Sequence, residues 1–442
     1  MYFRIDLRLH DQPALREAVE AGPEGVVPLF VFDDRLWGPS SDIRRAALVA
    51  AMRDLGDRIG GLHVVHGDPA VEVPRVVRAA EASSVHVSAD FQPYGSERDV
   101  ALAEALAEID VPLVRTGSPY AVAPGRITKP DGTPYKVFTP FFRAWKEHGW
   151  RAPAPEVRTA PWIRPEGRTH AIPDITLPDG ITLPPLGERA ARRRWREWID
   201  DVASYDDIRD LPGRDETSRM SPHLAWGTIH PRTLLADLAP LRSQGADAYV
   251  RELAFREFYA DVLHHRPDSA TGYYDQKFEK MRYDEPGDAF AAWQEGTTGF
   301  PIVDAGMRQL RAEGWMHNRV RMIVASFLVK DLHVEWMHGA AHFYRWLVDG
   351  DLASNQHGWQ WTAGCGTDAS PYFRVFNPIT QGKKFDPDGT YVRRWVPELR
   401  DVPARHVHEP WTAPEPVADY PAPIVDHAEE RREALARYEE IR

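Results

Sequence analysis

Cysteine is almost absent from this sequence of 442 residues, because Cys365 is the only one. A single cysteine excludes an internal disulfide, and we interpret it as a small apolar residue of the core. Long apolar runs are missing too, and no charged segment followed by an apolar stretch opens the chain. The sequence therefore predicts neither a membrane span nor an export signal, and we expect a cytoplasmic protein.

Two common nucleotide-binding motifs are also missing. No GxGxxG follows the first predicted strand and no GxxxxGK[ST] loop occurs, which argues against a Rossmann dinucleotide site and a P-loop. Metal-binding patterns are equally sparse. His338 and His342 stand four residues apart, but neither a third ligand nor the glutamate of an HExxH motif accompanies them. We therefore predict no metal site.

Positive charge is scarce relative to negative charge, and the formal net charge is −12. This sign disfavours general binding to nucleic acid, so a nucleic-acid partner requires a local basic patch. Candidates for such a patch lie in the second half of the chain: Arg256, Arg319, Arg321, Arg374, Lys383 and Lys384. A further basic group is interpreted as the solvated face of a helix: Arg189, Arg192, Arg193, Arg194 and Arg196.

Hydrophobic residues make up 43% of the chain, which is enough to build the cores of two domains. In residues 1–125, short apolar runs alternate with amphipathic helical patterns. This alternation predicts an α/β domain with a parallel, Rossmann-like sheet. The first strand is short, and the other strands are predicted at 26–32, 63–67, 84–90 and 111–117, with helices at 44–59 and 95–109.

Residues 126–188 are rich in proline and contain PDG twice, so we predict a connector that wraps the surface. From 189 to 442 helical periodicity dominates and strand signals vanish. The second domain is therefore predicted to be all-α.

The segment GWMHNRVRMIVASFLVKDL at 314–332 places polar groups at helical spacing among apolar ones. On a helix starting near Trp315, the side chains of Trp315, Asn318, Met322 and Ser326 share one face. A buried amide needs a partner, so this face predicts a helix that lines a polar cavity.

Three other short runs suggest chemistry but are weak evidence alone. TSRMS at 217–221 offers hydroxyls, amides and an arginine suited to a pyrophosphate, although Thr-Ser is also an ordinary helix cap. Asp349-Gly350-Asp351 is typical of a turn. Trp359 and Trp361 are separated by about 200° on a helix and so face opposite ways.

These runs occur in order with others, and together they resemble the DNA photolyase/cryptochrome family, most closely its class I cyclobutane-pyrimidine-dimer photolyases. The resemblance is carried by FRIDLRLHDQPAL at 3–15, TSRMSPHLAWG at 217–227, ELAFREFY at 252–259, TGFPIVDAGMRQL at 298–310, WMHNRVRMIVASFLVKDL at 315–332, DGDLASNQHGWQW at 349–361 and PYFRVFNPITQGKKFD at 371–386. It implies an antenna domain over 1–125 and a helical, FAD-binding catalytic domain over 189–442. The implied activity is light-driven repair of cyclobutane pyrimidine dimers by electron transfer from reduced FAD.

The resemblance also implies roles for individual residues. The implied FAD-binding residues are Tyr205, Thr217, Ser218, Arg219, Met220, Ser221, Tyr249, Arg321, Asp349, Gly350, Asp351 and Asn355. Asn355 faces flavin N5 in this assignment. The implied electron relay comprises Trp359, Trp336 and Tyr283. The implied substrate and DNA contacts are Glu252, Phe255, Arg256, Asn318, Met322, Trp361, Arg209, Arg319, Arg374 and Gln381.

Several positions depart from the family pattern. Tyr2, Phe255 and Tyr283 replace family tryptophans, and Ile5 replaces an arginine. Phe255 mildly favours the alternative of a signalling cryptochrome without repair activity, whereas the retained cavity residues favour repair. A histidine at position 318 would indicate repair of (6-4) photoproducts, but this chain has asparagine. We expect a monomer that binds damaged DNA.

A second, light-harvesting pigment is also implied by the resemblance. Asp90 and Arg45 match contacts to a deazaflavin, while Ala225 replaces a lysine that often contributes. We expect a deazaflavin or flavin-type antenna, bound between the domains, if one is present.

Overall fold

The computed structural model describes residues 1–368, 373–415 and 417–442. Pro371 and Tyr372, which open the last of the family motifs, lie outside the described residues. The chain divides into two compact units. Unit 1 comprises Met1–Pro178, Pro184–Ala203 and Ser218–Pro267, and unit 2 comprises Asp179–Leu183, Ser204–Thr217 and Asp268–Arg442.

Unit 1 contains the predicted parallel strands. β1 (Tyr2–Phe3), β2 (Leu29–Phe32) and β3 (His63–His66) form one sheet in this order, and β4 (Val85–Val87) pairs with β5 (Leu113–Arg115). Every pairing is parallel, and β2 to β5 fall inside the predicted ranges. The prediction of a parallel α/β domain is therefore confirmed.

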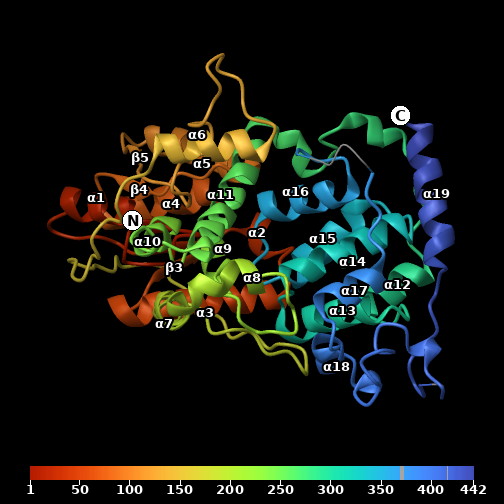
Figure 1. Ribbon diagram of the computed structural model, residues 1–442. Coiled ribbons are helices and arrows are strands. Elements are labelled where there is room, and N and C mark those ends of the chain that lie inside the picture. The colour runs from red at the N-terminus through yellow and green to blue at the C-terminus, as the bar shows by residue number, and fades with distance from the viewer. Residues whose placement is uncertain (369–372, 416) are drawn as a thin grey trace. The chain divides into compact units, whose positions relative to one another are not determined.

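The sheet is buried on both faces, as expected for parallel strands covered by helices. Along β2, Phe30 and Phe32 belong to one apolar cluster, whereas Leu29 and Val31 belong to another. This alternation follows from the two-residue period of a strand. The helices of unit 1 are α1 (Pro13–Ala21), α2 (Asp34–Trp37), α3 (Asp42–Ile59), α4 (Pro69–Ala80), α5 (Pro93–Ala107), α6 (Phe138–His148), α7 (Glu188–Trp198), α9 (Ser221–Ala225), α10 (Pro231–Leu238) and α11 (Gln244–His265) (Figure 1).

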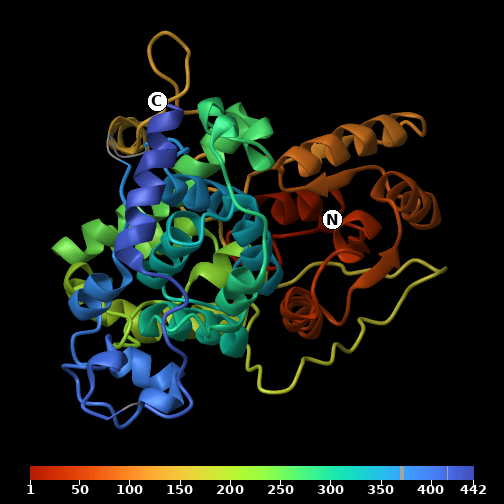
Figure 2. The same cartoon turned by 90° about the vertical axis from the view of Figure 1, so that its right-hand side faces the viewer.

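The stretch predicted as a connector contains one helix. α6 buries Phe138, Phe141 and Trp145 and packs against α11. The rest of 149–187 runs without helix or strand, apart from a single bridge between Val26 and Trp162 (Figure 2). The connector is therefore only partly irregular, because three large aromatic side chains give its first part an apolar helical face.

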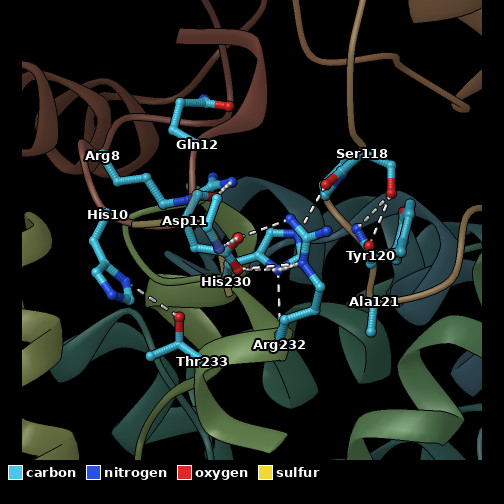
Figure 3. A network of polar contacts seen from close by, with 12 residues as sticks. Arg8, His10, Asp11, Gln12, Ser118, Tyr120, Ala121, His230, Arg232 and Thr233 are labelled. Atoms are coloured by element: carbon cyan, nitrogen blue, oxygen red, sulfur yellow. Dashed lines mark hydrogen bonds and ion pairs between the residues drawn. The ribbon is translucent and has the colours of Figure 1, made fainter. Parts of the chain in front are cut away.

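The helical segment 218–267 joins the α/β part through a buried polar network (Figure 3). Asp11 is fully buried and accepts hydrogen bonds from Arg232 Nη2 and the Ala154 amide, both at 2.8 Å. Burial opposes ionisation of Asp11, but its contact with His230 and the charge of Arg232 hold its pKa at about 2. His230 also contacts the carbonyl oxygen of Ser118 at 2.8 Å. An ion pair of this kind is costly to break, because the remaining partner stays buried without compensation.

Gly227 adds a second link within unit 1. Its φ is +62°, and a Cβ there would collide with the carbonyl oxygen of Ile5 and lie 2.8 Å from the Cα of Asp6. Only glycine combines this left-handed conformation with such a close backbone approach. The last residue of TSRMSPHLAWG therefore has a structural role.

The regular elements of unit 2 among its described residues are helices, apart from an isolated bridge between Asp284 and Val334, in agreement with the predicted all-α domain. Its α-helices are α8 (Tyr205–Ile208), α12 (Asp288–Glu295), α13 (Pro301–Glu313), α14 (Asn318–Lys330), α15 (Trp336–Trp346), α16 (Leu352–Ala363), α17 (Pro378–Phe385), α18 (Thr390–Trp395) and α19 (His427–Glu440). The 3-10 helices of unit 2 are η3 (Gln276–Lys280), η4 (Pro397–Leu399) and η5 (Pro410–Thr412), while η1 (Ile199–Ser204) lies in unit 1 up to Ala203 and η2 (Pro267–Ala270) begins at the last residue of unit 1. α14 contacts α13, α15, α16, α17 and α19 and so lies at the centre of this unit (Figure 1).

The motif TGFPIVDAGMRQL also has a structural explanation. Asp304 is fully buried and accepts hydrogen bonds from the Thr298 amide at 2.7 Å, the Gly299 amide at 3.1 Å and the Tyr420 hydroxyl at 2.6 Å. These bonds fix the loop before α13 and the segment before α19. Cys365 is fully buried, so its interpretation as a core residue is confirmed.

Candidate functional site

The start of α14 corrects one prediction. The helix begins at Asn318, because the His317 ring nitrogen accepts the Arg319 amide hydrogen at 3.2 Å and caps the first turn. Trp315 lies in the three-residue turn after Gly314, whose φ of +61° ends α13. Trp315 therefore does not continue the helical face of Asn318, Met322 and Ser326. Along that face burial increases, from an exposed Asn318 through Met322 to a buried Ser326.

An ion pair links α14 to the loop after α15. The guanidinium of Arg321 donates from Nη2 to Asp349 Oδ2 at 2.8 Å and from Nε to the carbonyl oxygen of Met316, also at 2.8 Å. The side chain of Asp349 is only 1% exposed, and its Oδ1 has no hydrogen-bond partner among the described residues. A buried carboxylate oxygen without a donor is costly. It suits an N–H or O–H group of a bound ligand.

Asn355 lies on α16, which begins just after this loop. Its Nδ2 donates to the carbonyl oxygen of Ala340 at 3.1 Å and to Oε1 of Gln356 at 2.9 Å. Both amide hydrogens are thus used within the protein, and the amide oxygen is the group that can meet a ligand donor. Asp351 is the N-cap of α16 and accepts the Ser354 amide hydrogen at 2.8 Å, with Gly350 buried beside it. The Asp349-Gly350-Asp351 run is therefore both a turn and a helix cap.

The two tryptophans of α16 occupy different environments, as predicted. Trp359 is 3% exposed and packs against Trp293 and Phe343, with ring centroids 6.2 and 4.9 Å away. Trp361 is half-buried. Trp359 also packs on Gly339 of α15, one helical turn after the fully buried Trp336. The first two predicted relay positions are therefore brought to the contact between α15 and α16.

Tyr283, the third predicted relay residue, does not meet Trp336 directly. No ring contact joins the two within the described part of the chain. Tyr273 lies between them, with its ring centroid 6.5 Å from that of Tyr283 and 6.2 Å from that of Trp336. Sequence reasoning missed Tyr273, since no family motif covers it.

Residues 218–220 of the TSRMS run form a tight loop in unit 1, directly before α9. The Ser218 hydroxyl lies 2.8 Å from the hydroxyl of Tyr249 and accepts the Met220 amide hydrogen at 3.3 Å. Arg219 has a φ of +54°, which is uncommon for a side chain other than glycine and marks a constrained backbone. Burial raises the pKa of Tyr249, so its hydroxyl keeps its proton. Ser221 opens the short helix α9 and is exposed, while Thr217 and Tyr205 are half-buried in unit 2.

α11 carries three predicted substrate residues, Glu252, Phe255 and Arg256, all half-buried. Phe255 stacks on Phe138 of α6 with the rings 9° from parallel and their centroids 3.4 Å apart. One face of Phe255 is therefore occupied within unit 1. Arg256 donates to the carbonyl oxygen of Pro119 at 3.1 Å and lies over the ring of Tyr120.

The carboxylate of Glu257 holds this part of α11 in place. It accepts hydrogen bonds from Trp145 Nε1 at 2.6 Å, from the Val122 amide at 3.1 Å and from the Ala121 amide. Burial raises the pKa of Glu257 to about 7. These bonds fix the angular position of α11, and with it that of Glu252.

The predicted DNA-binding residues of unit 2 differ in how they are held. Arg319 makes a bidentate ion pair with Asp210, at 3.1 Å from Nε to Oδ1 and 2.8 Å from Nη2 to Oδ2. Arg209 lies over the ring of Tyr205, Arg374 is exposed, and Gln381 is half-buried on α17. Asp210 was not predicted from the sequence. Its charge offsets that of Arg319.

Two arginines of the basic group on α7 form ion pairs with acids of unit 1, consistent with a structural surface. Arg189 bonds Asp54 at 2.5 Å, and Arg192 lies 3.7 Å from Glu156.

The two predicted antenna residues both have partners in unit 1. Asp90 lies 3.0 Å from Arg98, and Arg45 donates to the carbonyl oxygens of Trp37 and Gly38.

No helix among the described residues is long and apolar enough to span a membrane.

Comparison with known proteins shows the family of this chain. Residues 1–159 match the family model described as DNA photolyase, and residues 249–440 match the FAD binding domain of DNA photolyase. The chain is 42% identical, over its whole length and 98% of the relative, to a deoxyribodipyrimidine photo-lyase of Streptomyces griseus.

Solved structures give the same result. The chain is similar to a bacterial class III photolyase from Agrobacterium tumefaciens, with 35% identity and a TM-score of 0.94 over 100% of this chain and 96% of that one. It is also similar to an archaeal photolyase from Sulfolobus tokodaii with two FAD molecules, with 28% identity and a TM-score of 0.88 over 99% of each chain. The class I assignment stays a prediction beside this class III relative. With full-length relatives of this identity, the chain belongs to the DNA photolyase/cryptochrome family.

Proposed function

We propose that the protein is a deoxyribodipyrimidine photo-lyase, which uses light and reduced FAD to split cyclobutane pyrimidine dimers in DNA. The observation that carries this proposal is the 42% identity to a photo-lyase over the whole chain. It favours repair over the signalling alternative. Bound FAD supplies the photoexcited electron, and the residues of this chain bind, orient and shield the reacting groups.

The flavin ring is the group that best fits the Arg321–Asp349 pair and Asn355. Reduced flavin carries negative charge, and a fixed guanidinium in a low-dielectric interior stabilises such a charge strongly. The unpartnered Oδ1 of Asp349 suits a ring N–H donor, and the amide oxygen of Asn355 suits another. Since Asp351 caps α16, we propose that its remaining lone pairs reach a flavin ring or ribose group.

The loop at 217–221 is proposed to bind the pyrophosphate of FAD. Its hydroxyls and the guanidinium of Arg219 are donors, and phosphate oxygens are acceptors that favour charged donors. Tyr205 and Tyr249 supply further hydroxyls. The left-handed backbone of Arg219 directs successive peptide groups differently from a helix, which supports a specialised loop.

We propose that Glu252, Asn318, Met322 and Trp361 contact the dimer after it has been flipped out of the duplex. Flipping costs a few kcal/mol, and less for a damaged pair that stacks poorly. The exposed amide of Asn318 and the half-buried indole of Trp361 remain accessible enough to contact a base. Phe255 would offer its second face, because Phe138 covers the first.

The repair proposal is tested with purified protein and an oligonucleotide that contains a thymine dimer. Reduced protein under blue light is expected to restore thymine absorbance near its ordinary ultraviolet maximum, whereas the same mixture in darkness is not. If saturating protein does not restore thymine absorbance, the repair function is contradicted and the alternative of a light-signalling protein without repair activity is favoured.

Glu252→Ala is expected to slow dimer splitting more than it weakens DNA binding. A hydrogen bond to a dimer that gains charge strengthens during the reaction, and removing such a bond costs roughly 10- to 100-fold in rate. Single-turnover splitting under a saturating flash measures the first effect, and titration with dimer-containing DNA measures the second. Equal losses in rate and affinity would assign Glu252 to binding alone.

DNA binding is expected to depend steeply on salt despite the net charge of −12. Phosphate contacts release counterions, so each lost contact reduces the logarithmic salt slope by roughly 1. Arg374→Ala should reduce the slope more than Arg319→Ala, because Asp210 already offsets the charge of Arg319. Asp210→Asn is the matched control, and it should tighten binding. A slope that none of the three variants alters would show that these residues do not contact phosphates.

An antenna pigment of deazaflavin or flavin type is proposed, in line with the second FAD of the Sulfolobus tokodaii relative. Asp90 and Arg45 already have partners inside unit 1, so binding must use their remaining acceptors and donors. Extraction of natively produced protein is expected to yield a second flavin or deazaflavin besides FAD. A folate as the sole second pigment would contradict this expectation.

We also propose that the protein acts as a monomer in the cytoplasm, with damaged DNA as its partner. Light scattering at micromolar concentration measures the mass of the protein in solution and so tests whether it is a monomer.

A further inference from the structure

Tyr273 of unit 2 makes a short hydrogen bond to a carboxylate. Its hydroxyl donates to Glu335 Oε1 at 2.6 Å, and its side chain is 5% exposed. Burial, together with the neighbouring Tyr283 and Glu335, raises the pKa of Tyr273. The phenol is therefore protonated at rest, and its proton already points at an acceptor.

The same pair touches the predicted electron path. Glu335 directly precedes Trp336 in the chain and is the N-cap residue of α15. The Tyr273 ring meets the Trp336 ring edge to face, with centroids 6.2 Å apart and planes at 77°. Ring contact at this distance permits rapid electron transfer between the two side chains.

The indole of Trp336 differs from the phenol of Tyr273 because its N–H group has no described proton acceptor. Trp336 is fully buried, and its Nε1 has no hydrogen-bond acceptor among the described residues. An indole N–H is only a donor. When Trp336 loses an electron it therefore has no described group to which it can release its proton, and it remains a strong oxidant. A phenol can be oxidised easily only if its proton leaves at the same time.

Tyr283 lacks both features. Its ring lies 6.5 Å from that of Tyr273 but makes no described contact with Trp336, and its hydroxyl has no carboxylate partner in the described chain. Among the described residues, Tyr273 contacts both rings, whereas Tyr283 contacts Tyr273 and not Trp336. Its protonated state is favoured further because burial raises the pKa of Tyr283.

We propose that Tyr273, with Glu335 as its proton acceptor, is the electron donor to oxidised Trp336, in the place predicted for Tyr283. This inference rests on the proposed relay through Trp359 and Trp336, in which photoexcited oxidised flavin is the oxidant. In the step, one electron passes from the Tyr273 ring to the Trp336 radical cation, and the phenolic proton passes to Glu335 Oε1. The products are neutral Trp336, a neutral tyrosyl radical and a protonated Glu335, so charge and atoms balance.

Three variants separate this donor from the alternatives, after a flash given to protein that holds oxidised FAD. Transient absorption and electron paramagnetic resonance should detect a tyrosyl radical in the unmodified protein. Tyr273→Phe should remove that signal, whereas the matched control Tyr283→Phe should keep it. Glu335→Gln keeps the size of the side chain but cannot take up the proton. It should slow radical formation roughly 10- to 100-fold, the range expected for loss of one hydrogen bond to a charged group.

Heavy water supplies a readout that a merely structural role would not change. Formation of the tyrosyl radical should slow in D2O in the unmodified protein, because the proton moves with the electron. Flavin content and circular dichroism identify any variant that fails to fold, and Glu335→Gln keeps the test valid if Tyr273→Phe does fail. Dimer splitting with chemically reduced FAD should be unchanged in all three variants.

Two outcomes overturn the inference while leaving the relay intact. One is a tyrosyl signal that survives Tyr273→Phe and disappears in Tyr283→Phe. The other is the absence of any tyrosyl signal while Trp359→Phe still blocks photoreduction. If Trp359→Phe leaves photoreduction intact, the relay itself is wrong, and the role of Tyr273 is overturned with it.

Discussion

Trp359→Phe is expected to nearly abolish photoreduction of bound FAD. Trp359 is buried among Trp293, Phe343 and Gly339, and it is the predicted first donor to oxidised flavin. Phenylalanine is much harder to oxidise than tryptophan, so the first electron transfer loses its driving force. The measurement is the bleaching of oxidised flavin absorbance under blue light with an external thiol present.

Two controls separate electron transfer from structural damage. Trp293→Phe removes a neighbouring indole that was not assigned to the relay, and it should preserve most of the photoreduction. Chemically reduced Trp359→Phe protein should split dimers at the rate of the unmodified protein, because the relay supplies electrons to the cofactor and does not touch the substrate. Loss of both photoreduction and chemically supported repair would mean that the substitution disturbs the flavin site.

Much of this architecture follows from local sequence patterns. Short apolar runs, such as the one that contains Leu29–Phe32, predict the strand boundaries to within three residues, because both faces of these strands are buried and apolar. The contrast between Trp359 and Trp361 followed from helical spacing alone. Cys365 was placed in the core from the general behaviour of isolated cysteines.

The beginning of α14 was predicted three residues too early, for a specific reason. Trp315 stands at helical spacing before Asn318, Met322 and Ser326, so periodicity does not mark the boundary. The available signals were Gly314, which ends α13 in a left-handed conformation, and His317, whose ring caps the next helix. Histidine is an infrequent N-cap, and local propensity therefore gave the wrong start.

The pairings that define the site could not be predicted in the same way. Arg319 and Asp210 are separated by 109 positions, and Tyr273 and Glu335 by 62. Such contacts depend on how whole helices pack, and nothing in the adjacent sequence encodes them. The family resemblance named Arg319 as a DNA contact but not the acid that neutralises it. It likewise named Tyr283 as the third relay residue and gave no indication of Tyr273, whose ring contacts both Tyr283 and Trp336.

Gly339→Ala is expected to destabilise unit 2 and to disturb the first step of photoreduction. A Cβ at this position would lie 2.5 Å from Cζ3 of Trp359 and 2.6 Å from Cδ2 of Leu328. The methyl group would thus be confined between an indole on α16 and a leucine on α14, both buried, so neither neighbour can move into solvent. Overpacking of this kind costs about 1–3 kcal/mol, against a gain in helix propensity of about 1 kcal/mol for alanine over glycine.

Gly358→Ala is the matched control, because it lies in the middle of α16 next to Trp359 and a Cβ there meets nothing within 4 Å. It should raise the free energy of unfolding by up to about 1 kcal/mol through helix propensity alone. Urea denaturation followed by far-ultraviolet circular dichroism gives both values, and flash-induced absorption reports the first electron transfer. If the two substitutions change stability and electron transfer alike, then α15 and α16 are not packed closely enough at Gly339 to fix the position of Trp359. A lower free energy of unfolding in Gly339→Ala and a higher one in Gly358→Ala would indicate that close packing at Gly339 keeps the indole of Trp359 against α15. Trp336 lies one helical turn from this contact.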